Sequence, residues 1–478
     1  MITRREDSSS AVLRMTERQH RQLYDHLFPG DGKEAVAVAL CGRAEGGGEW
    51  EAGQRRCLSV YRIEPVPHNV CTVRTEERVI WPTDLIIPLL VEAEKKGMAL
   101  LKVHSHPGGY PRFSAVDDAS DCDLFPGVAE WVGTDLPHAS AVMLPSGHVF
   151  ARLVSGRNFT PIDVVTVAGE EIRFFRHDET GRAEGDEKLR VRTRQAFGPG
   201  TTDILAGLSA AVIGVSGTGS PTVEMLARLA VGELILVDDD RVENKNRGRI
   251  LNTFPEHAAA AAYKVDVIGE AVRRMGFGTR VVPIARNLWD PSVVRRVAQA
   301  DVIFGCMDTV DGRDLLNRLA AFYCIPYLDV GVALEADGRG GVDQICGTVH
   351  YLQPGGSSLA SRSIFTPADV RAASLRRTNP AAYEELVRAG YLRGVRVERP
   401  AVISVNMLFA ALGVNELLAR LHGYRDDGNT GFAAFGMSLT QARLIADEDG
   451  VPCPALAPRV GRGDCSPLLG VPELGVRR

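Results

Sequence analysis

The segment 104–117 contains two histidines, a serine and an aspartate whose spacing suits a metal ion. Residues 104–107 read His-Ser-His-Pro, and Ser114 and Asp117 follow after six more residues. Because residues two apart on a strand point to the same side, His104 and His106 offer two imidazoles on one face. A carboxylate from a nearby turn completes three zinc ligands and leaves a fourth position for water, as in catalytic zinc sites. The pattern therefore predicts a hydrolytic zinc centre.

Such a centre also needs a base for the attacking water and a donor for the oxyanion. Ser114 is the candidate donor, and Glu34, at the start of an apolar strand, is the candidate acid/base. Two other interpretations stay open at this point. Ser114 and Asp117 also fit a helix-capping pair, and Asp118 could replace Asp117 as the ligand. The combined pattern nevertheless favours a metal site.

The pattern H-x-H-P-x6-S-x-x-D resembles that of the JAB/MPN metalloprotease family, also called JAMM, over about residues 10–155. The resemblance implies that His104, His106 and Asp117 bind Zn2+, that Ser114 stabilises the oxyanion, and that an upstream glutamate is the acid/base. It also implies a deubiquitinase-like hydrolase that cleaves peptide or isopeptide bonds after the C-terminal glycine of a ubiquitin-like protein.

A glycine-rich turn between an apolar strand and a helix forms a second candidate site. Gly214, Gly217 and Gly219 give the order G-x-x-G-x-G and not G-x-G-x-x-G, because position 216 is serine. Glycines there let the backbone approach phosphates at the helix N-terminus. Asp238, at the end of the next strand, is placed to bind a ribose. The turn alone also fits a tight connection without a ligand.

The polar residues farther along the chain distinguish a nicotinamide enzyme from an adenylating one. They are Asp238, Asp240, Asn246, Arg249, Lys264, Asp308 and Arg313. Cations hold a triphosphate, and a carboxylate binds Mg2+. A dinucleotide site has no need for this combination, so the sequence favours ATP with Mg2+.

These residues resemble the pattern of the ThiF/E1 superfamily over about residues 190–425. Its motif D-x-D-x-V-x-x-x-N-x-x-R is met by Asp238, Asp240, Val242, Asn246 and Arg249. The resemblance implies that Lys264 binds phosphate, that Asp308 binds Mg2+, and that Arg194 reaches the ATP of the other subunit in a homodimer. It further implies adenylation of the C-terminal glycine of a ubiquitin-like or sulfur-carrier protein, followed by transfer to a separate conjugating enzyme or a sulfur donor.

The sequence departs from this superfamily in its cysteines. Many members bind a structural zinc through two C-x-x-C pairs, but residues 356–360, where the first pair would fall, contain no cysteine. The thioester-forming cysteine is also missing, because residues 347–452 contain none. Cys324 and Cys346 flank apolar segments and are expected to be buried, whereas Cys453 and Cys465 lie near the C-terminal end. We therefore expect the reaction to stop at the acyl-adenylate.

The elements that position these residues alternate in type along the chain. The first domain is predicted to be mixed α/β, with helices at 16–28, 82–96 and 114–125 and strands at 34–42, 98–106, 139–144 and 148–153. Residues 1–15 are expected to fray, and Gly46–Gly48 to form a hairpin loop. The second is predicted to be a Rossmann-like doubly wound domain, with strands at 210–216, 233–239, 279–285 and 301–307 and a long apolar helix at 399–421.

A chain of 478 residues is long enough for two or three domains. We expect the first at 10–155, a connecting segment and linker at 156–189, the adenylation domain at 190–425, and an irregular tail at 426–478 rich in glycine, proline and aspartate.

Composition and charge limit the remaining classes. A hydrophobic content of 45% and a charged content of 24% are typical of globular proteins. A net charge of -5 argues against a nucleic-acid partner, and no apolar run of membrane-helix length is expected. The nine cysteines form no close pairs, and the N-terminus lacks a signal-peptide core, so we expect reduced thiols in the cytoplasm.

The sequence thus predicts a bifunctional enzyme that adenylates a ubiquitin-like protein with ATP-Mg and cleaves bonds after such a C-terminus at a zinc site. Two alternatives remain. One is E1-like adenylation of a small peptide or metabolite. The other is a regulatory scaffold with a decayed ATP site, suggested by Ser216 and the missing cysteines.

Overall fold

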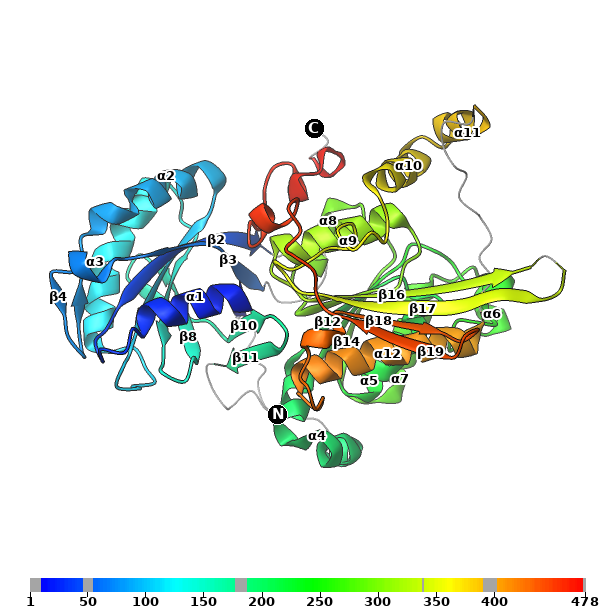
Figure 1. Ribbon diagram of the computed structural model, residues 1–478, viewed down its shortest axis with the longest axis horizontal. Coiled ribbons are helices and arrows are strands. Elements are labelled where there is room, and N and C mark those ends of the chain that lie inside the picture. Colours follow the sequence, from blue (N-terminus) through cyan, green and yellow to red (C-terminus); the bar gives the residue numbers. More distant parts are fainter. Residues whose placement is uncertain (1–9, 46–54, 177–186, 338, 390–401, 476–478) are drawn as a thin grey trace. The chain divides into compact units, whose positions relative to one another are not determined.

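The computed structural model describes residues 10–45, 55–176, 187–337, 339–389 and 402–475 (Figure 1). The chain forms two compact units. The first comprises residues 1–181, 321–324 and 458–478, and the second comprises 182–320 and 325–457. The predicted hairpin loop at Gly46–Gly48 and residues 177–186 of the predicted connecting segment and linker lie outside the described residues.

The first unit is built on a nine-stranded sheet in the order β11-β10-β1-β3-β2-β6-β7-β8-β9. Its strands are β1 (Ala11–Thr16), β2 (Val36–Glu45), β3 (Arg56–Pro65), β6 (Ala99–Ser105), β7 (His138–Met143), β8 (Val149–Ser155), β9 (Asn158–Pro161), β10 (Val164–Ala168) and β11 (Ile172–Arg176). A small hairpin pairs β4 (Val73–Arg74) with β5 (Val79–Ile80). The helices are α1 (Glu17–Leu27), α2 (Ile87–Lys96) and α3 (Ala115–Val132).

Both faces of this sheet are covered, which explains the continuous apolar run of β2. Ala37 and Ala39 belong to the core cluster that contains Leu23 of α1. Val38 belongs to the opposite cluster, which contains Leu89 of α2 and residues of α3. Because side chains alternate between the faces of a strand, a strand buried on both sides is apolar at every position.

The predicted helices of the first unit are present, and their ends have clear causes. Thr16 caps α1 in a capping box with Gln19, and α2 ends at Gly97, whose φ of 64° is left-handed. Helix α3 continues to Val132, beyond the predicted end at residue 125, although it contains Pro126. Phe125 and Val132 are both buried in the core, so packing outweighs the effect of the proline.

Two expectations about the edges of the first domain were wrong. Residues 11–16 do not fray but form β1, which pairs in parallel with both β10 and β3 and is buried at every position. The segment 156–176 is not a connection, since it forms β9, β10 and β11 of the same sheet. Charged Arg14 inside β1 hid the first strand, and tight turns between short strands hid the others.

The second unit contains an eight-stranded sheet in the order β14-β13-β12-β15-β16-β17-β18-β19. Its strands are β12 (Ser209–Ile213), β13 (Glu233–Val237), β14 (Arg280–Ile284), β15 (Val302–Gly305), β16 (Tyr327–Ala336), β17 (Val342–Leu352), β18 (Ala434–Ser438) and β19 (Arg443–Asp447). Its helices are α4 (Glu187–Gly207), α5 (Gly219–Arg228), α6 (Pro255–Ala259), α7 (Lys264–Met275), α8 (Pro291–Val297), α9 (Val310–Phe322), α10 (Pro367–Thr378), α11 (Pro380–Arg388) and α12 (Ile403–Leu421).

Strands β12 to β16 are parallel, with α5, α7 and α12 on one face and α8 and α9 on the other (Figure 1). This confirms the predicted doubly wound α/β fold. The chain runs from β12 outward to β13 and β14, and then returns to β15 on the other side of β12. In such sheets ligands bind beyond the carboxyl ends of the strands at this point of reversal.

The expected irregular tail at 426–478 was wrong for residues 434–447, whereas residues 448–475 contain only turns and short 3-10 helices, as expected. Residues 434–447 form β18 and β19, because Phe435 and Met437 pack against the core cluster of Val330 and Phe409. Residues 458–478 belong to the first unit. Their glycines and prolines concealed a tightly packed segment.

This C-terminal segment lies against the backbones of β2 and β3. The Gly42 amide donates to the Gly461 carbonyl at 3.1 Å, and the Asp464 amide donates to the Arg43 carbonyl at 2.7 Å. Gly461 has a φ of 72°, and a Cβ there would lie 1.9 Å from the Val60 oxygen. The contact therefore requires glycine.

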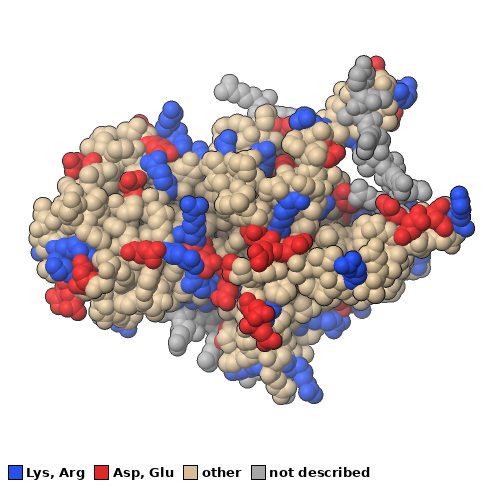
Figure 2. Space-filling model, in the orientation of Figure 1, with Lys and Arg blue, Asp and Glu red and all other residues tan. Residues whose placement is uncertain are grey.

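Contrary to expectation, one described helix, α12, is long and apolar enough to span a membrane by length and composition. Of its most apolar window, 61% is buried within the protein, and Val405 and Phe409 pack against Val330 and Val349 of the sheet. Its place in the core accounts for its apolar composition. On the surface, basic and acidic side chains are interspersed over the face shown in Figure 2, in keeping with the small net charge.

Candidate functional site

The side chains of His104, His106 and Asp117 meet in the first unit. His104 ends the apolar face of β6 that looks toward α2 and α3, His106 follows that strand, and Asp117 lies in the first turn of α3. The His104 Nε2 lies 2.8 Å from Asp117 Oδ1, the His106 Nε2 lies 3.3 Å from Asp117 Oδ2, and the two Nε2 atoms lie 3.2 Å apart. All three residues are buried.

These distances fit a zinc ion. Tetrahedral ligands about 2.0–2.1 Å from zinc lie about 3.3 Å from one another. The Nδ1 of His106 lies 2.8 Å from the Tyr110 carbonyl, so with a cation bound the ring proton would lie on Nδ1 and the Nε2 lone pair would face the ion. Without a cation, two imidazole nitrogens would face each other across a buried gap. The donor set and its orientation therefore suit Zn2+.

The charges of the three groups are coupled. Burial lowers the pKa of His104. Burial also opposes protonation of His106, but its hydrogen bonds to Asp117 and the Tyr110 carbonyl outweigh that effect and raise its pKa. Burial acts against the Asp117 carboxylate, yet the hydrogen bonds from both histidines hold its pKa well below the usual range. Asp117 is thus a carboxylate at neutral pH, as a metal ligand must be.

Ser114 and Asp117 have the capping role that the sequence left open, and the site uses the same geometry. The Ser114 amide donates to Asp117 Oδ2 at 2.6 Å, and the Asp117 amide donates to Ser114 Oγ at 3.2 Å. The cap fixes the carboxylate toward the histidines. Because Ser114 Oγ accepts in this cap, its hydroxyl proton remains available for a substrate oxygen.

Glu34 precedes β2 and is 7% exposed. Its amide donates to the Thr75 carbonyl at 2.7 Å, and its carbonyl accepts from the Arg74 Nε at 2.9 Å, so its backbone is held from both sides. Burial raises the pKa of Glu34 to about 7, and the next largest influences are the charges of His106 and Asp117. A carboxyl group with a pKa near neutrality beside these side chains is suited to general acid/base work.

Asp118, the alternative ligand, points elsewhere. Its carboxylate pairs with Arg152 of β8, and its side chain is half exposed. Arg152 also binds Asp121, which is paired in turn with Lys102 of β6. This network was not predicted from the sequence. Its signal was present in the spacing, since Lys102 precedes His104 by two residues and Asp121 follows Asp117 by four.

In the second unit, the glycine-rich turn leads from β12 into α5. Gly214 has a φ of 85°, and a Cβ on Gly219 would lie 1.8 Å from the Gly214 oxygen. A Cβ on Gly217 would lie 2.5 Å from the Asn406 side chain. Ser216 is not among the described residues with positive φ, so serine fits that position without strain. The departure at residue 216 therefore does not indicate a decayed turn.

Asp238 follows β13 and contacts both the glycine-rich turn and Lys264. Its carboxylate accepts from the Val215 amide at 2.9 Å and from the Asp240 amide at 2.9 Å. Lys264, which is buried, lies 2.6 Å from Asp240 Oδ2 and 3.7 Å from Asp238 Oδ1. Burial raises the pKa of Asp238, against the charge of Lys264. The lysine that the sequence assigned to phosphate thus pairs with two aspartates here.

The other residues predicted to bind the nucleotide follow β13 and β15 of the same sheet. Asn246 is buried, and its Oδ1 accepts from Arg249 at 3.3 Å. The Arg249 Nε is buried without a hydrogen-bond partner among the described residues, so it retains a donor for an anion. Asp308 is exposed in the loop after β15, whereas Arg313 is committed to a bidentate pair with buried Asp329.

Arg194 lies on α4 and is exposed. The single chain brings together the glycine turn, Asp238 and Lys264 around the ends of β12 and β13, and Asp308 follows β15 on the other side of β12. The role of Arg194 in a second subunit remains a prediction.

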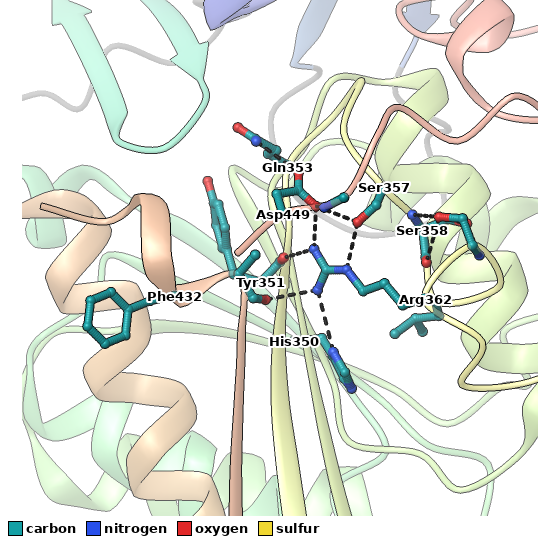
Figure 3. Close-up of polar contacts among 12 residues, drawn as sticks. His350, Tyr351, Gln353, Ser357, Ser358, Arg362, Phe432 and Asp449 are labelled. Carbon is teal, nitrogen blue, oxygen red and sulfur yellow. Dashed lines mark hydrogen bonds and ion pairs between the residues drawn. The ribbon is translucent and has the colours of Figure 1, made fainter. Parts of the chain in front are cut away.

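A polar network occupies the region where a first zinc-binding cysteine pair would fall (Figure 3). Arg362 donates to Ser357 Oγ at 2.7 Å, to the Tyr351 carbonyl at 2.9 Å and to Asp449 Oδ1 at 2.9 Å. Gln353 and Ser357 also donate to Asp449. Burial acts against the Asp449 carboxylate, but these donors lower its pKa. The network ties residues 351–362 to the chain beyond β19.

The free cysteines show little sign of a reactive thiol. Cys324 and Cys453 are buried, and Cys346 and Cys465 are partly buried. Burial raises the pKa of Cys324 to about 12, and burial and then the charge of Glu335 raise the pKa of Cys346. Reactive cysteines have a lowered pKa and are accessible, so the environments of Cys324 and Cys346 do not activate a nucleophile.

Comparisons with known proteins match the two units to two families. Residues 190–452 match the family model of the ThiF family, and residues 16–154 match that of the prokaryotic homologs of the JAB domain. The first match extends beyond the predicted end at residue 425 and includes β18 and β19.

Curated relatives match parts of the chain. A ubiquitin-like modifier-activating enzyme 5 of Aedes aegypti is 24% identical over 224 residues, covering 44% of this chain and 54% of its own length. The SAMP-activating enzyme E1 of Haloferax volcanii is 32% identical over 115 residues, covering 24% of this chain and 42% of its own length. The adenylyltransferase and sulfurtransferase MOCS3 of Sus scrofa is 34% identical over 135 residues, covering 28% and 29%.

The chain thus spans little more than half the length of the first of these relatives and less than half of the other two. Among solved structures, the crystal structure of E. coli MccB has a TM-score of 0.45 and 17% identity, covering 56% of this chain and 74% of that one.

Proposed function

Because the chain belongs to the ThiF family and carries a JAB domain ahead of that region, we propose that it combines a peptidase and an adenylating enzyme that act on one ubiquitin-like partner. In this proposal the first unit exposes or frees the C-terminal glycine of the partner. The second unit activates that glycine with ATP.

The convergence of His104, His106 and Asp117 within 3.3 Å carries the peptidase proposal. Zinc, when bound there, supplies Lewis acidity and lowers the pKa of water. Glu34 accepts the proton of the attacking water and returns it to the leaving amine, a role that matches its pKa of about 7. The Ser114 hydroxyl donates to the oxyanion that forms on the scissile carbonyl.

The adenylation proposal rests on the residues at the carboxyl ends of β12, β13 and β15. Lys264 and Arg249 bind phosphates, and Asp238 binds the ribose. Asp308 is the Mg2+ ligand, and the metal neutralises phosphate charge when bound. The partner's terminal carboxylate attacks the α-phosphate, the bond to the leaving pyrophosphate breaks, and an acyl-adenylate forms.

We further propose that the reaction stops at the acyl-adenylate and that another nucleophile takes over the acyl group. The buried surroundings of Cys324 and the raised pKa of Cys346 support this, as does the lack of cysteine between 347 and 452. A homodimer in which Arg194 acts on the other subunit, and a cytoplasmic location, belong to the same proposal. The nine free cysteines are in keeping with that location.

Exchange of labelled pyrophosphate into ATP tests the adenylation proposal directly. We expect exchange only with a ubiquitin-like protein that ends in glycine, and none with NAD in place of ATP. Exchange with a short peptide or a metabolite instead would favour the alternative substrate class. Absence of exchange with every acceptor, together with no ATP binding by calorimetry, would favour a regulatory scaffold.

Cleavage of a partner that carries a C-terminal extension tests the peptidase proposal. We expect release of the extension after glycine, by the wild-type protein and not after zinc is removed with a chelator. Readdition of zinc should restore cleavage. Cleavage that continues in metal-free protein would contradict the proposal.

A further inference from the structure

The buried charges behind the metal centre form a second layer that faces its ligands. Lys102 is 4% exposed, Arg152 is 6% exposed and Asp121 is 0% exposed. Arg152 donates to Asp121 Oδ2 from Nη2 at 2.6 Å and from Nε at 3.2 Å, and Lys102 pairs with Asp121. A carboxylate this deeply buried is stable only with such partners, so the three side chains hold one another in fixed positions.

The spacing of these residues matches that of the ligands. Lys102 and His104 are two residues apart on β6 and therefore share a face, with their positions about 6.6 Å apart. Asp117 and Asp121 are four residues apart on α3, which is a rise of about 6 Å. The pairs His104–Asp117 and Lys102–Asp121 thus form two parallel rungs between one strand and one helix. The Lys102–Asp121 pair therefore fixes the position of α3 along the direction of β6.

Arg152 adds a third point of attachment from β8. Its guanidinium pairs with Asp118, the neighbour of Asp117. The same guanidinium lies between the rings of Phe113 and Phe159, 3.8 Å and 3.7 Å from their centroids. Phe113 precedes Ser114, so Arg152 contacts the residues adjacent to both the predicted ligand and the predicted oxyanion donor.

From this geometry we propose that Arg152, acting through Asp118, Asp121 and Phe113, is a positioning residue for the metal centre. It sets the rotation and register of the first turns of α3, so that Asp117 faces His104 and His106 while Asp118 faces away. The inference rests on the proposed zinc site and adds the device that selects one of two adjacent aspartates as the ligand.

Zinc affinity of the full chain, measured by competition with a chromophoric chelator, tests this role without any substrate. Arg152→Met should retain the fold, by circular dichroism, and weaken zinc binding about 10- to 100-fold, as loss of groups that orient metal ligands does. Arg152→Lys keeps the charge but not the planar fork, and should fall between wild type and Arg152→Met. The control is Arg62→Met, which removes an arginine paired with Glu92 elsewhere in the same unit and should leave zinc affinity unchanged.

Asp118→Asn keeps the test decisive if Arg152→Met does not fold, since the Asp118 side chain is half exposed. It should weaken zinc binding by several-fold to tenfold and alter the visible spectrum of the cobalt-substituted protein, which reports ligand geometry. Wild-type affinity and an unchanged cobalt spectrum in folded Asp118→Asn and Arg152→Lys would overturn the positioning role.

The outcome also separates this inference from the proposed function. If zinc binds and the variants weaken it, but no extension is ever cleaved, the positioning role stands and the peptidase proposal fails. If the wild-type chain binds no zinc, both fail.

Discussion

The proposed metal centre of the first unit and the proposed nucleotide site of the second differ in what their side chains contact. His104, His106 and Asp117 contact one another, with their nitrogen and oxygen atoms 2.8–3.3 Å apart. In the second unit, Lys264 pairs with Asp238 and Asp240, so groups assigned to phosphate and ribose neutralise one another. In the proposed metal centre the fold itself brings the candidate ligands together, whereas in the proposed nucleotide site the candidate phosphate-binding lysine is paired with aspartates of the same chain.

The largest expected effect comes from removing a ligand of the proposed zinc site while the proposed nucleotide site stays intact. Asp117→Ala should abolish stoichiometric zinc binding and reduce cleavage by more than about 10³-fold, because it removes one of three protein ligands. Pyrophosphate exchange should remain at the wild-type level. Asp308→Ala is the matched converse and should reduce exchange while zinc content stays at one per chain. Loss of both activities in either variant would show that the two sites are not independent.

The acid/base variant sharpens the comparison within the first unit. Glu34→Gln should retain zinc and lower kcat for cleavage by about 10²- to 10⁴-fold, since general acid/base catalysis contributes that much. Zinc content by mass spectrometry and cleavage assays of the same preparation check both halves. Normal cleavage by this variant would place the base elsewhere.

The raised pKa of Glu34 predicts a pH dependence. The base is the carboxylate, so kcat/KM should fall about tenfold per pH unit below a midpoint at or below about 7, because a bound cation moves the midpoint down. In the metal-free protein, the folded state binds this proton more tightly than the unfolded state between the ordinary pKa of 4.5 and about 7. Stability therefore decreases as pH rises through that window.

Glu34→Gln removes this titration and supplies the control. Denaturant unfolding of the metal-free proteins should show the variant more stable than wild type at pH 8, with the difference vanishing near pH 4. An equal difference at both pH values would contradict the assigned pKa.

A smaller effect is expected from the Arg362–Asp449 ion pair of the second unit. It lies in the region where many members of the superfamily have zinc-binding cysteines. Arg362→Met should lower the stability of this unit by roughly 2–4 kcal/mol, since it leaves Asp449 with fewer partners in a mostly buried position. Thermal unfolding checks this, and a chelator should not lower the wild-type transition of this unit. Arg228→Met is the control, because Arg228 pairs with Glu224 on an exposed helix face.

The smallest expected effect concerns the C-terminal segment. Gly461→Ala should destabilise the first unit by about 1–3 kcal/mol, because φ is positive and the new Cβ would meet the Val60 carbonyl. Gly156→Ala is the matched control, with a φ of 58° and nothing within 4 Å of its Cβ. A similar loss in both variants would attribute the effect to backbone strain rather than to the contact.

The sequence predicted features that local chemistry determines. The spacing of His104, His106 and the aspartates at 117 and 118 predicted that two imidazoles and a carboxylate would meet, because a strand and a capped helix have fixed periods. The parallel strands of the second unit were found for the same reason, and their fold is confirmed. Strand β1 was missed because Arg14 interrupts its apolar run, although that side chain is buried in the structure.

What the sequence could not provide depends on contacts between distant residues. Asp117 could be chosen over Asp118 as the candidate ligand only by knowing that Arg152 of β8 pairs with Asp118. Residues 458–464 looked irregular because glycine at positive φ is typical of loops, and nothing local reveals that β2 and β3 lie beneath them. Similarly, Arg362 and Asp449 carry no motif, and only the fold brings them together.

The return of residues 458–464 to β2 and β3 sets an order of events during synthesis. The strands that they cover leave the ribosome before any of the second unit has been made, and the covering segment emerges after it. At about 5–20 residues per second, the backbone of Gly42 and Val60 waits on the order of tens of seconds for its partner. During translation the first unit is thus completed last, and a ribosome that stalls within the second unit would present its sheet without this cover.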